Sequence, residues 1–184
     1  MERSYRGYTL RRALGGELPA LPDVEHLAAQ QFRHSSQPYA AGLPVQSLEQ
    51  LQEHQQQGGV WVAVTKEGTV AAFAICKPVD GALFIVEADV HPAHARQGLG
   101  AALFGLLGEW ARAEAWPALL LTTFRDVPWN APYYERLGFR VLQEDEQGPG
   151  LRTIRAQETQ FGLPPESRVC MRLELDAPPA PPGG

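Results

Sequence analysis

The chain has 184 residues, of which 44% are hydrophobic and 20% are charged, and its formal net charge is −5. This length and composition suffice for the core of one globular domain. Because the sequence contains no basic stripe, no apolar run of membrane length and no signal peptide, we expect neither nucleic acid nor a membrane as a partner.

The first elements that we expect are a strand and a helix. Residues 8–13 alternate between the two faces of a strand, residues 14–22 form a loop, and a helix follows over residues 23–31. Its buried stripe is expected from four residues at helical spacing: Val24, Leu27, Ala28 and Gln31. Residues 32–43 break the pattern and are expected to form an irregular loop.

A second helix begins at Ser47, which forms a capping-box pattern with Gln50, and it ends at Gly58 and Gly59. The pattern then changes to that of a three-stranded meander with turns at 66–68 and 78–81. Its strands are expected at residues 60–65, 69–77 and 82–90.

A glycine-rich turn follows this meander. Pro92 prevents the third strand from continuing, and Gly98 and Gly100 precede an apolar helix over residues 99–115. The glycines permit a tight turn, and the first N–H groups of the helix point outward at the positive end of its dipole. This geometry accepts phosphate oxygens. A plain strand-to-helix turn has the same spacing, so the glycines alone leave both interpretations open.

The second half of the chain continues with an apolar strand over residues 118–123 and a short helix that Asn130 can cap. This helix carries Tyr133 and Tyr134 and ends at Gly138. The remaining elements are a strand at 139–142, an exposed turn at 144–150, a helix at 151–161 and a strand at 168–175. We therefore expect one α/β domain, with a mixed, mostly antiparallel sheet of about six or seven strands and helices on both faces.

Domain boundaries follow from composition. We expect the globular domain over residues 1–175, and a disordered tail over the Pro- and Gly-rich residues 176–184. The two cysteines, Cys76 and Cys170, match no metal spacing and are expected to be buried free thiols, which favours a cytoplasmic location. His91 and His94 have the spacing H-x-x-H but no clear third ligand, so we expect no metal site.

Two motifs stand in order along the chain: R-Q-G-L-G-A at residues 96–101 and N-A-P-Y-Y-E-R-L-G-F at 130–139. Together they resemble the GNAT superfamily of N-acetyltransferases, whose core shows Q/R-x-x-G-x-G/A followed by Y-x-x-x-G-F. The resemblance extends over roughly residues 8–175. The first position of the glycine pattern departs from the family, because Ala95 stands where Gln or Arg is usual.

The resemblance implies that the chain binds acetyl-CoA. The pyrophosphate would lie on the N–H groups of the glycine turn, with the Arg96 side chain nearby; the turn consists of Arg96, Gln97, Gly98, Leu99, Gly100 and Ala101. The pantetheine arm would bind as an added strand along Ala88, Asp89 and Val90. Asn130 would border the thiol end, although it also fits the role of a helix cap.

The resemblance also implies an acid and a base. An amine must lose a proton to attack a thioester, and the departing thiolate gains one. Tyr134 matches the family's proton donor, with a core aromatic residue as the alternative. Glu87 can take the amine proton, directly or through a water, but Asp89 shares its face of the strand and is an alternative base.

The implied function is direct acetyl transfer to a primary amine, with a small molecule as the expected acceptor. Two other functions stay open at this point. One is acetylation of a protein lysine or N-terminus, and the other is a sensor module that binds acetyl-CoA without turnover. The resemblance also leaves a homodimer open, since many members of the family form dimers.

Overall fold

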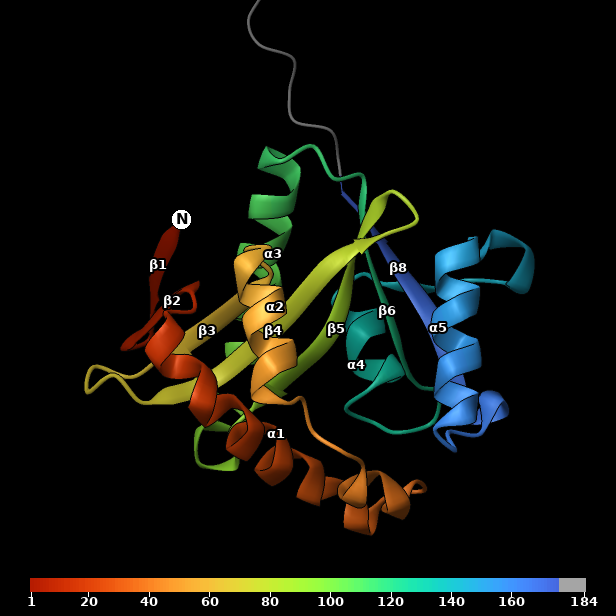
Figure 1. Ribbon diagram of the computed structural model, residues 1–184, viewed down its shortest axis with the longest axis horizontal. Coiled ribbons are helices and arrows are strands. Elements are labelled where there is room, and N and C mark those ends of the chain that lie inside the picture. Colours follow the sequence, from red (N-terminus) through yellow and green to blue (C-terminus); the bar gives the residue numbers. More distant parts are fainter. Residues whose placement is uncertain (176–184) are drawn as a thin grey trace, which may run out of the picture. The chain divides into compact units, whose positions relative to one another are not determined.

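The structure is a computed structural model that describes residues 1–175 (Figure 1). The chain divides into two compact units. The first unit comprises Met1–Lys77 and Ile85–Leu106, and the second comprises Pro78–Phe84 and the chain from Leu107 onward. The tail predicted at residues 176–184 lies outside the described residues.

The first unit contains most of an antiparallel run of strands. They follow chain order: β1 (Glu2–Tyr5), β2 (Tyr8–Arg12), β3 (Val60–Val64), β4 (Val70–Val79) and β5 (Ala82–Val90). Its helices are α1 (Leu21–Ala29), α2 (Leu48–Gln56) and the first half of α3 (Leu99–Ala113). Short 3-10 turns complete it: η1 (Gly15–Ala20), η2 (Gln30–His34), η3 (Pro38–Gly42) and η4 (Pro92–His94).

The fold is the expected α/β arrangement, with a mostly antiparallel sheet of eight strands where about six or seven were expected. The additional strand is β1, which pairs with β2 through the two-residue turn at Arg6 (φ 48°) and Gly7 (φ 89°). Two successive residues with positive φ form the tight turn that matches the twist of a hairpin. Because β1 is short and polar, its sequence carries little strand signal.

Both faces of β3 and β4 are buried. One face, which includes Val62 and Phe73, packs against Leu21 and Val24 of α1 and against Leu51 of α2. The opposite face is fully buried as well, with Trp61, Ala63, Ala72 and Ala74 all at 0% exposure. Figure 1 shows α1 and α2 in front of these strands and α3 behind them. Helices therefore cover both faces, as expected.

Several helix boundaries differ from the sequence prediction. The capping box of α2 is confirmed, because the Ser47 N–H donates to Gln50 Oε1 at 2.8 Å and the Gln50 N–H donates to Ser47 Oγ at 3.2 Å. The loop predicted at 14–22 is wrong, since it contains η1 and the start of α1. Leu27 was expected in the core but is 41% exposed, because the buried stripe of α1 begins at Leu21 and shifts the helix face.

The second unit centres on β8 (Arg168–Glu174), which pairs antiparallel with both β6 (Ala118–Phe124) and β7 (Arg140–Val141). Its helices are the second half of α3, α4 (Ala131–Arg136) and α5 (Pro149–Gln160). The short turns η5 (Glu144–Glu146) and η6 (Pro165–Ser167) flank α5 along the chain. The exposed turn predicted up to residue 150 therefore ends earlier, because Pro149 already begins α5.

The turn between β4 and β5 belongs to the second unit and anchors α5. It consists of Asp80 (φ 50°) and Gly81 (φ 73°), so the turn predicted at 78–81 is shorter and β4 extends through the exposed Pro78. The Asp80 carboxylate accepts the N–H groups of Gly150 and Leu151, each at 2.8 Å. A carboxylate at this position satisfies the first amides of α5 and complements the helix dipole.

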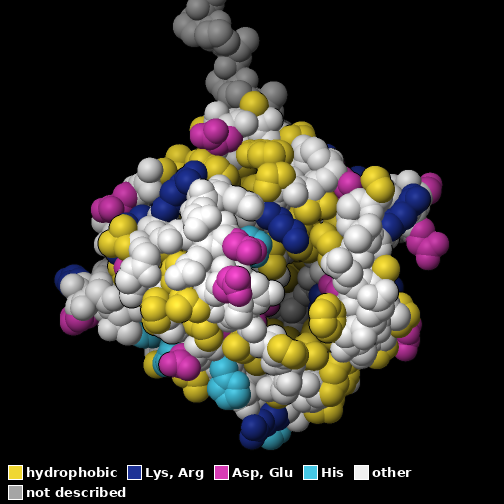
Figure 2. All heavy atoms as spheres, in the orientation of Figure 1, with side chains coloured by type: hydrophobic (Ala, Val, Ile, Leu, Met, Phe, Trp, Pro, Cys, Tyr) yellow, Lys and Arg dark blue, Asp and Glu magenta, His cyan; other side chains and the backbone are white. Residues whose placement is uncertain are grey.

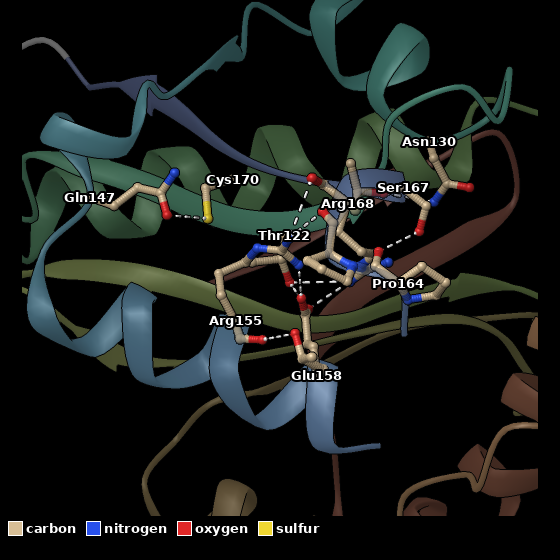
Figure 3. A network of polar contacts seen from close by, with 12 residues as sticks. Thr122, Asn130, Gln147, Arg155, Glu158, Pro164, Ser167, Arg168 and Cys170 are labelled. Carbon is tan, nitrogen blue, oxygen red and sulfur yellow. Dashed lines mark hydrogen bonds and ion pairs between the residues drawn. The ribbon is translucent and has the colours of Figure 1, made fainter. Parts of the chain in front are cut away.

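A buried ion network connects α5 to the strands of the second unit (Figure 3). Glu158 accepts from Arg168 at 2.7 Å and from the Thr122 hydroxyl, and it pairs with Arg155. Burial opposes ionisation of Glu158, but the charge of Arg168 and the hydrogen bonds from Arg168, Thr122 and Arg155 outweigh it and lower its pKa. Glu158 is therefore an ionised group fixed by its partners.

Surface charge is mixed. On the face in Figure 2, the Lys and Arg side chains lie apart from one another, with acidic and uncharged side chains between them. Within residues 1–175, no helix combines the length and the apolar character that a membrane crossing requires. The predicted absence of a nucleic-acid partner stays a prediction.

We predict that Glu158→Ala destabilises the protein by roughly 3–5 kcal/mol, because it leaves buried arginines without their counter-charge. The Glu158 side chain is only 11% exposed. Urea unfolding would measure the change. Glu146→Ala is the matched control, since its pair with Arg140 lies in water at 36% and 51% exposure and should contribute far less. Equal losses in the two variants would contradict this interpretation.

Candidate functional site

The glycine turn between β5 and α3 begins with a fixed exit from the strand. The His91 N–H donates to Ala71 O at 2.8 Å, which holds the end of β5 against β4. The His91 Nδ1 then accepts the Ala93 N–H at 3.1 Å and caps the short turn η4. These bonds direct the chain out of the sheet toward residues 95–101.

The backbone of this turn is left-handed at two exposed residues, Arg96 (φ 60°) and Gly98 (φ 79°). Glycine accepts this conformation freely, whereas a residue with a Cβ pays about 1–2 kcal/mol for it. The first hydrogen bond of α3 runs from the Ala102 N–H to Gly98 O at 3.0 Å. The amides of Leu99, Gly100 and Ala101 precede that bond and lie at the positive end of the helix dipole. Such amides can bind an anion.

Side chains of the β1–β2 hairpin contact the turn. The Tyr8 hydroxyl lies 2.9 Å from His94 Nδ1 and 3.0 Å from Gln97 Oε1. Tyr5 lies over Gly98, because a Cβ built there would come within 2.5 Å of the Tyr5 hydroxyl. The turn thus depends on a hairpin distant in sequence.

A cluster of three carboxyl groups lies in the same unit. Glu87 and Asp89 are half-buried on β5, and Glu25 of α1 is 8% exposed. The Gln46 N–H donates to Glu25 Oε2 at 2.9 Å. The Ala88 N–H lies 3.3 Å from Glu87 Oε1. Because like charges in one buried place repel each other, the three groups cannot all ionise together at neutral pH.

Two members of this cluster, Glu25 and Asp89, have raised pKa values. Burial, followed by the charge of Glu87, raises the pKa of Glu25 to about 8, although the bond from Gln46 opposes the shift. Burial, Glu87 and Glu25 raise the pKa of Asp89 well above its usual range. Near neutral pH, both shifts favour the protonated forms of Glu25 and Asp89.

Asn130 occupies the start of α4, but its side chain does not cap the helix. Instead, its Nδ2 donates to Thr123 Oγ1 at 2.8 Å, where Thr123 is buried on β6. The Asn130 Oδ1 is buried, and among the described residues it has no hydrogen-bond partner. A buried acceptor in this state is suited to a donor from a ligand.

Tyr134 lies on α4 in an aromatic group. Its ring centroid is 5.5 Å from that of Tyr133 and 5.7 Å from that of Phe139, both edge-to-face. Burial raises the pKa of Tyr133, and the charge of Arg136 partly opposes the shift. These contacts fix the Tyr134 ring within its unit.

The sequence analysis did not identify Glu25, Tyr5 or Tyr8 as site residues. A signal for Glu25 was present, because it stands four residues after Leu21 and one after Val24, on the buried stripe of α1. A carboxyl group on the core-facing stripe of a helix is costly to bury, so it signals a functional role. Tyr5 and Tyr8 gave no such signal, since only the register of the hairpin pairs them.

His91 and His94 are already engaged through Nδ1, with Ala93 and Tyr8 respectively. Within the described part of the chain, no group of three or more His, Cys, Asp or Glu side chains is arranged to hold a metal ion. The cysteines in this part are free and buried, and burial raises the pKa of Cys76 to about 12 and that of Cys170 to about 11.

Comparison with known proteins gives a family match. Residues 21–139 match the family model described as Acetyltransferase (GNAT) family. The matched range includes α1 with Glu25, the strand with Glu87, the glycine turn, and α4 with Tyr134.

Solved structures of the same fold include the ribosomal-protein-S18-alanine N-acetyltransferase of Escherichia coli. It is 21% identical, with 96% of this chain and 99% of that chain covered and a TM-score of 0.63. The PaiA N-acetyltransferase of Thermoplasma acidophilum, solved with coenzyme A, is 15% identical (91% and 98% covered, TM-score 0.66). N-acetylglutamate synthase of Neisseria gonorrhoeae, solved with coenzyme A and N-acetyl-glutamate, is 18% identical (94% and 36% covered, TM-score 0.68).

The carboxyl cluster predicts a pH-dependent stability. The usual pKa of a Glu is 4.5, and that of Glu25 is raised to about 8 in the folded chain, so the unfolded chain loses this proton first as the pH rises. Stability should therefore fall between about pH 4.5 and pH 8. In Glu25→Gln this loss is absent, so the free energy of unfolding of the variant relative to that of the wild type should rise by at least about 1 kcal/mol from pH 5 to pH 9. Urea unfolding would measure both proteins at the two pH values. The same difference between them at pH 5 and at pH 9 would contradict the assignment.

Proposed function

The chain belongs to the acetyltransferase (GNAT) family, and from that premise we propose that it transfers the acetyl group of acetyl-CoA to a primary amine of a small molecule. The observation that carries the proposal is the left-handed backbone at Arg96 and Gly98 directly before α3. Strain of this kind in an exposed turn is typical of ligand sites.

The residues of the glycine turn fit a pyrophosphate. In the proposal, the amides from Gln97 through Ala101 bind its oxygens, and the exposed Arg96 adds a positive charge. Ala88, Asp89 and Val90, at the end of β5, bind the pantetheine arm as an added strand. Asn130 Oδ1, buried without a partner among the described residues, accepts a hydrogen bond from the amide N–H of the pantetheine arm nearest the thioester.

Acetyl-CoA supplies the acetyl group as a thioester. We assign the general base to Glu87, because Glu25 and Asp89, whose pKa values are raised, favour the protonated form near neutral pH. Glu87 takes a proton from the acceptor ammonium, directly or through a water, and the neutral nitrogen attacks the thioester carbon. The N–H of Val90 is suited to polarise the carbonyl oxygen.

We assign the general acid to Tyr134. When the carbon–sulfur bond breaks, the electron pair leaves with sulfur and the Tyr134 hydroxyl gives it a proton. The second proton that the attacking nitrogen loses passes to the Tyr134 oxygen and restores the hydroxyl. The edge-to-face contacts with Tyr133 and Phe139 hold the ring in one place. No covalent bond to the protein forms, so both substrates must be bound together.

An amine acceptor is supported by the cluster of three carboxyl groups, Glu25, Glu87 and Asp89. Negative charge in such a cluster attracts a cationic amine, the form that exists at neutral pH. The free, buried cysteines are typical of a reducing compartment, so we also propose a cytoplasmic location. A homodimer, and one domain over residues 1–175, remain proposals.

We predict that Gly98→Ala weakens acetyl-CoA binding at least about tenfold, because a Cβ disfavours the left-handed backbone by ~1–2 kcal/mol. The Cβ would also come within 2.5 Å of the Tyr5 hydroxyl. Calorimetric titration would measure the affinity. Gly68→Ala is the matched control, because Gly68 has φ 85° and open space around its Cβ position in the β3–β4 turn. It should lower thermal stability yet leave the affinity unchanged. Absence of acetyl-CoA binding by the folded wild type would overturn the proposed function.

We predict that Tyr134→Phe lowers kcat by about a hundredfold on an accepted amine while acetyl-CoA affinity is unchanged, because only proton donation is lost. Release of free thiol during turnover of a panel of amines would measure kcat. Tyr133→Phe removes a hydroxyl from the neighbouring ring and should leave kcat within about twofold of the wild type.

The panel also distinguishes the alternatives. Turnover of peptide N-termini or lysines, but of no small amine, would replace the proposed acceptor by a protein. Binding of acetyl-CoA without turnover of any amine or peptide would replace the enzyme by a sensor module. A Tyr134→Phe variant as active as the wild type would remove Tyr134 from the acid role.

A further inference from the structure

The β1–β2 hairpin reaches the glycine turn at three points. Its tight turn at Arg6 and Gly7 places Tyr5 and Tyr8 directly opposite each other. Tyr8 contacts Gln97, and the Tyr5 hydroxyl lies next to Gly98, as described above. The Arg6 guanidinium lies 3.5 Å from Gln97 O. These contacts converge on the residues around the two left-handed positions of the turn.

The hydrogen bonds of Tyr8 have one consistent direction. Its single proton is donated to Gln97 Oε1 at 3.0 Å, so the bond of 2.9 Å with His94 must run from His94 Nδ1–H to the Tyr8 oxygen. The Tyr8 side chain is 9% exposed, and its ring meets that of His94 edge-to-face at 5.6 Å. Through these two hydrogen bonds, the Tyr8 hydroxyl links His94, at the start of the turn, to Gln97 at its centre.

Gln97, which Tyr8 holds, lies at the centre of the left-handed part of the turn. Gln97 stands between Arg96 and Gly98, the two residues with positive φ. A left-handed non-glycine residue persists only where its surroundings hold it. The Gln97 side chain is held by Tyr8, and its carbonyl is near Arg6, so the hairpin contacts the residue that joins the two left-handed positions.

We infer that Tyr8 is a positioning residue for acetyl-CoA, because its hydroxyl holds Gln97 and keeps the glycine turn in its phosphate-binding conformation before the ligand arrives. The inference rests on the proposed function. Tyr8 acts through Gln97 and touches no reacting atom. Preorganisation of this kind raises affinity, because the ligand does not have to order the turn. It leaves the chemical step unchanged.

Tyr8→Phe tests the inference, since it removes the hydroxyl and keeps the buried ring. We expect the Kd and the KM for acetyl-CoA to rise about three- to tenfold, with kcat at saturation within about twofold of the wild type. In the ligand-free variant, amide hydrogen exchange over residues 96–101 should become faster than in the wild type. A merely structural role would lower thermal stability without this split between KM and kcat.

Thr65→Val is the matched control. Thr65 Oγ1 accepts the N–H groups of Glu67 and Thr69, each at 3.3 Å, in the β3–β4 turn of the same unit. Its loss should reduce stability and leave the Kd for acetyl-CoA unchanged. In a double-mutant cycle, Gln97→Leu should remove the effect of Tyr8→Phe, since the hydroxyl acts through Gln97.

The outcomes separate the two proposals. A wild type that fails to bind acetyl-CoA would overturn the proposed function and this inference with it. A wild type that binds, together with a Tyr8→Phe variant of equal Kd and unchanged exchange over residues 96–101, would overturn the inference alone. Additive effects of Tyr8→Phe and Gln97→Leu on Kd would contradict the route through Gln97.

Discussion

The proposed acetyl-CoA site depends on one constraint, the left-handed backbone on either side of Gln97. If Arg96 or Gly98 relaxed to negative φ, the chain would enter α3 from another direction and the leading amides would no longer face one place. Glycine removes the cost at one position but not at Arg96. The cost at Arg96 must be offset by contacts, and a hairpin near the N-terminus supplies them. The conformation of this turn therefore depends on both its local sequence and its packing against a distant segment.

The two units bury acidic side chains in opposite electrostatic surroundings. Glu158 faces arginines, its pKa is lowered, and it fastens α5 to the strands. Glu25 faces other carboxyl groups, and its pKa is raised to about 8. The first arrangement stabilises the fold. The second lowers its stability at neutral pH, which indicates a role in binding or catalysis. This contrast makes the cluster around Glu87 a stronger functional candidate than its composition alone would.

Local signals allowed most of the fold to be predicted. The capping box at Ser47, the strands of the β3–β4 hairpin and the apolar helix after Gly98 lie close to their predicted places. Two features failed because tertiary packing decides them. The strand β1 exists through its pairing with β2, and the core stripe of α1 is set by contacts of Leu21. The site motifs were recognised by resemblance. The hydrogen bond from Tyr8 to Gln97 and the bond from Gln46 to Glu25 could not be predicted from residue spacing, because each joins residues distant in the chain.

The path of the chain through the two units bears on how the protein can be dissected. Residues 78–84 leave the first unit and supply Asp80 to the start of α5, seventy positions further on, before the chain returns at Ile85. No single truncation therefore separates the units, because each is made of two segments interleaved with those of the other. During synthesis on the ribosome, the Asp80 carboxylate can contact both of its amide partners only after the chain has been extended to Leu151. A fragment designed to isolate the first unit would therefore lose either Asp80 or the helix α5 that it caps.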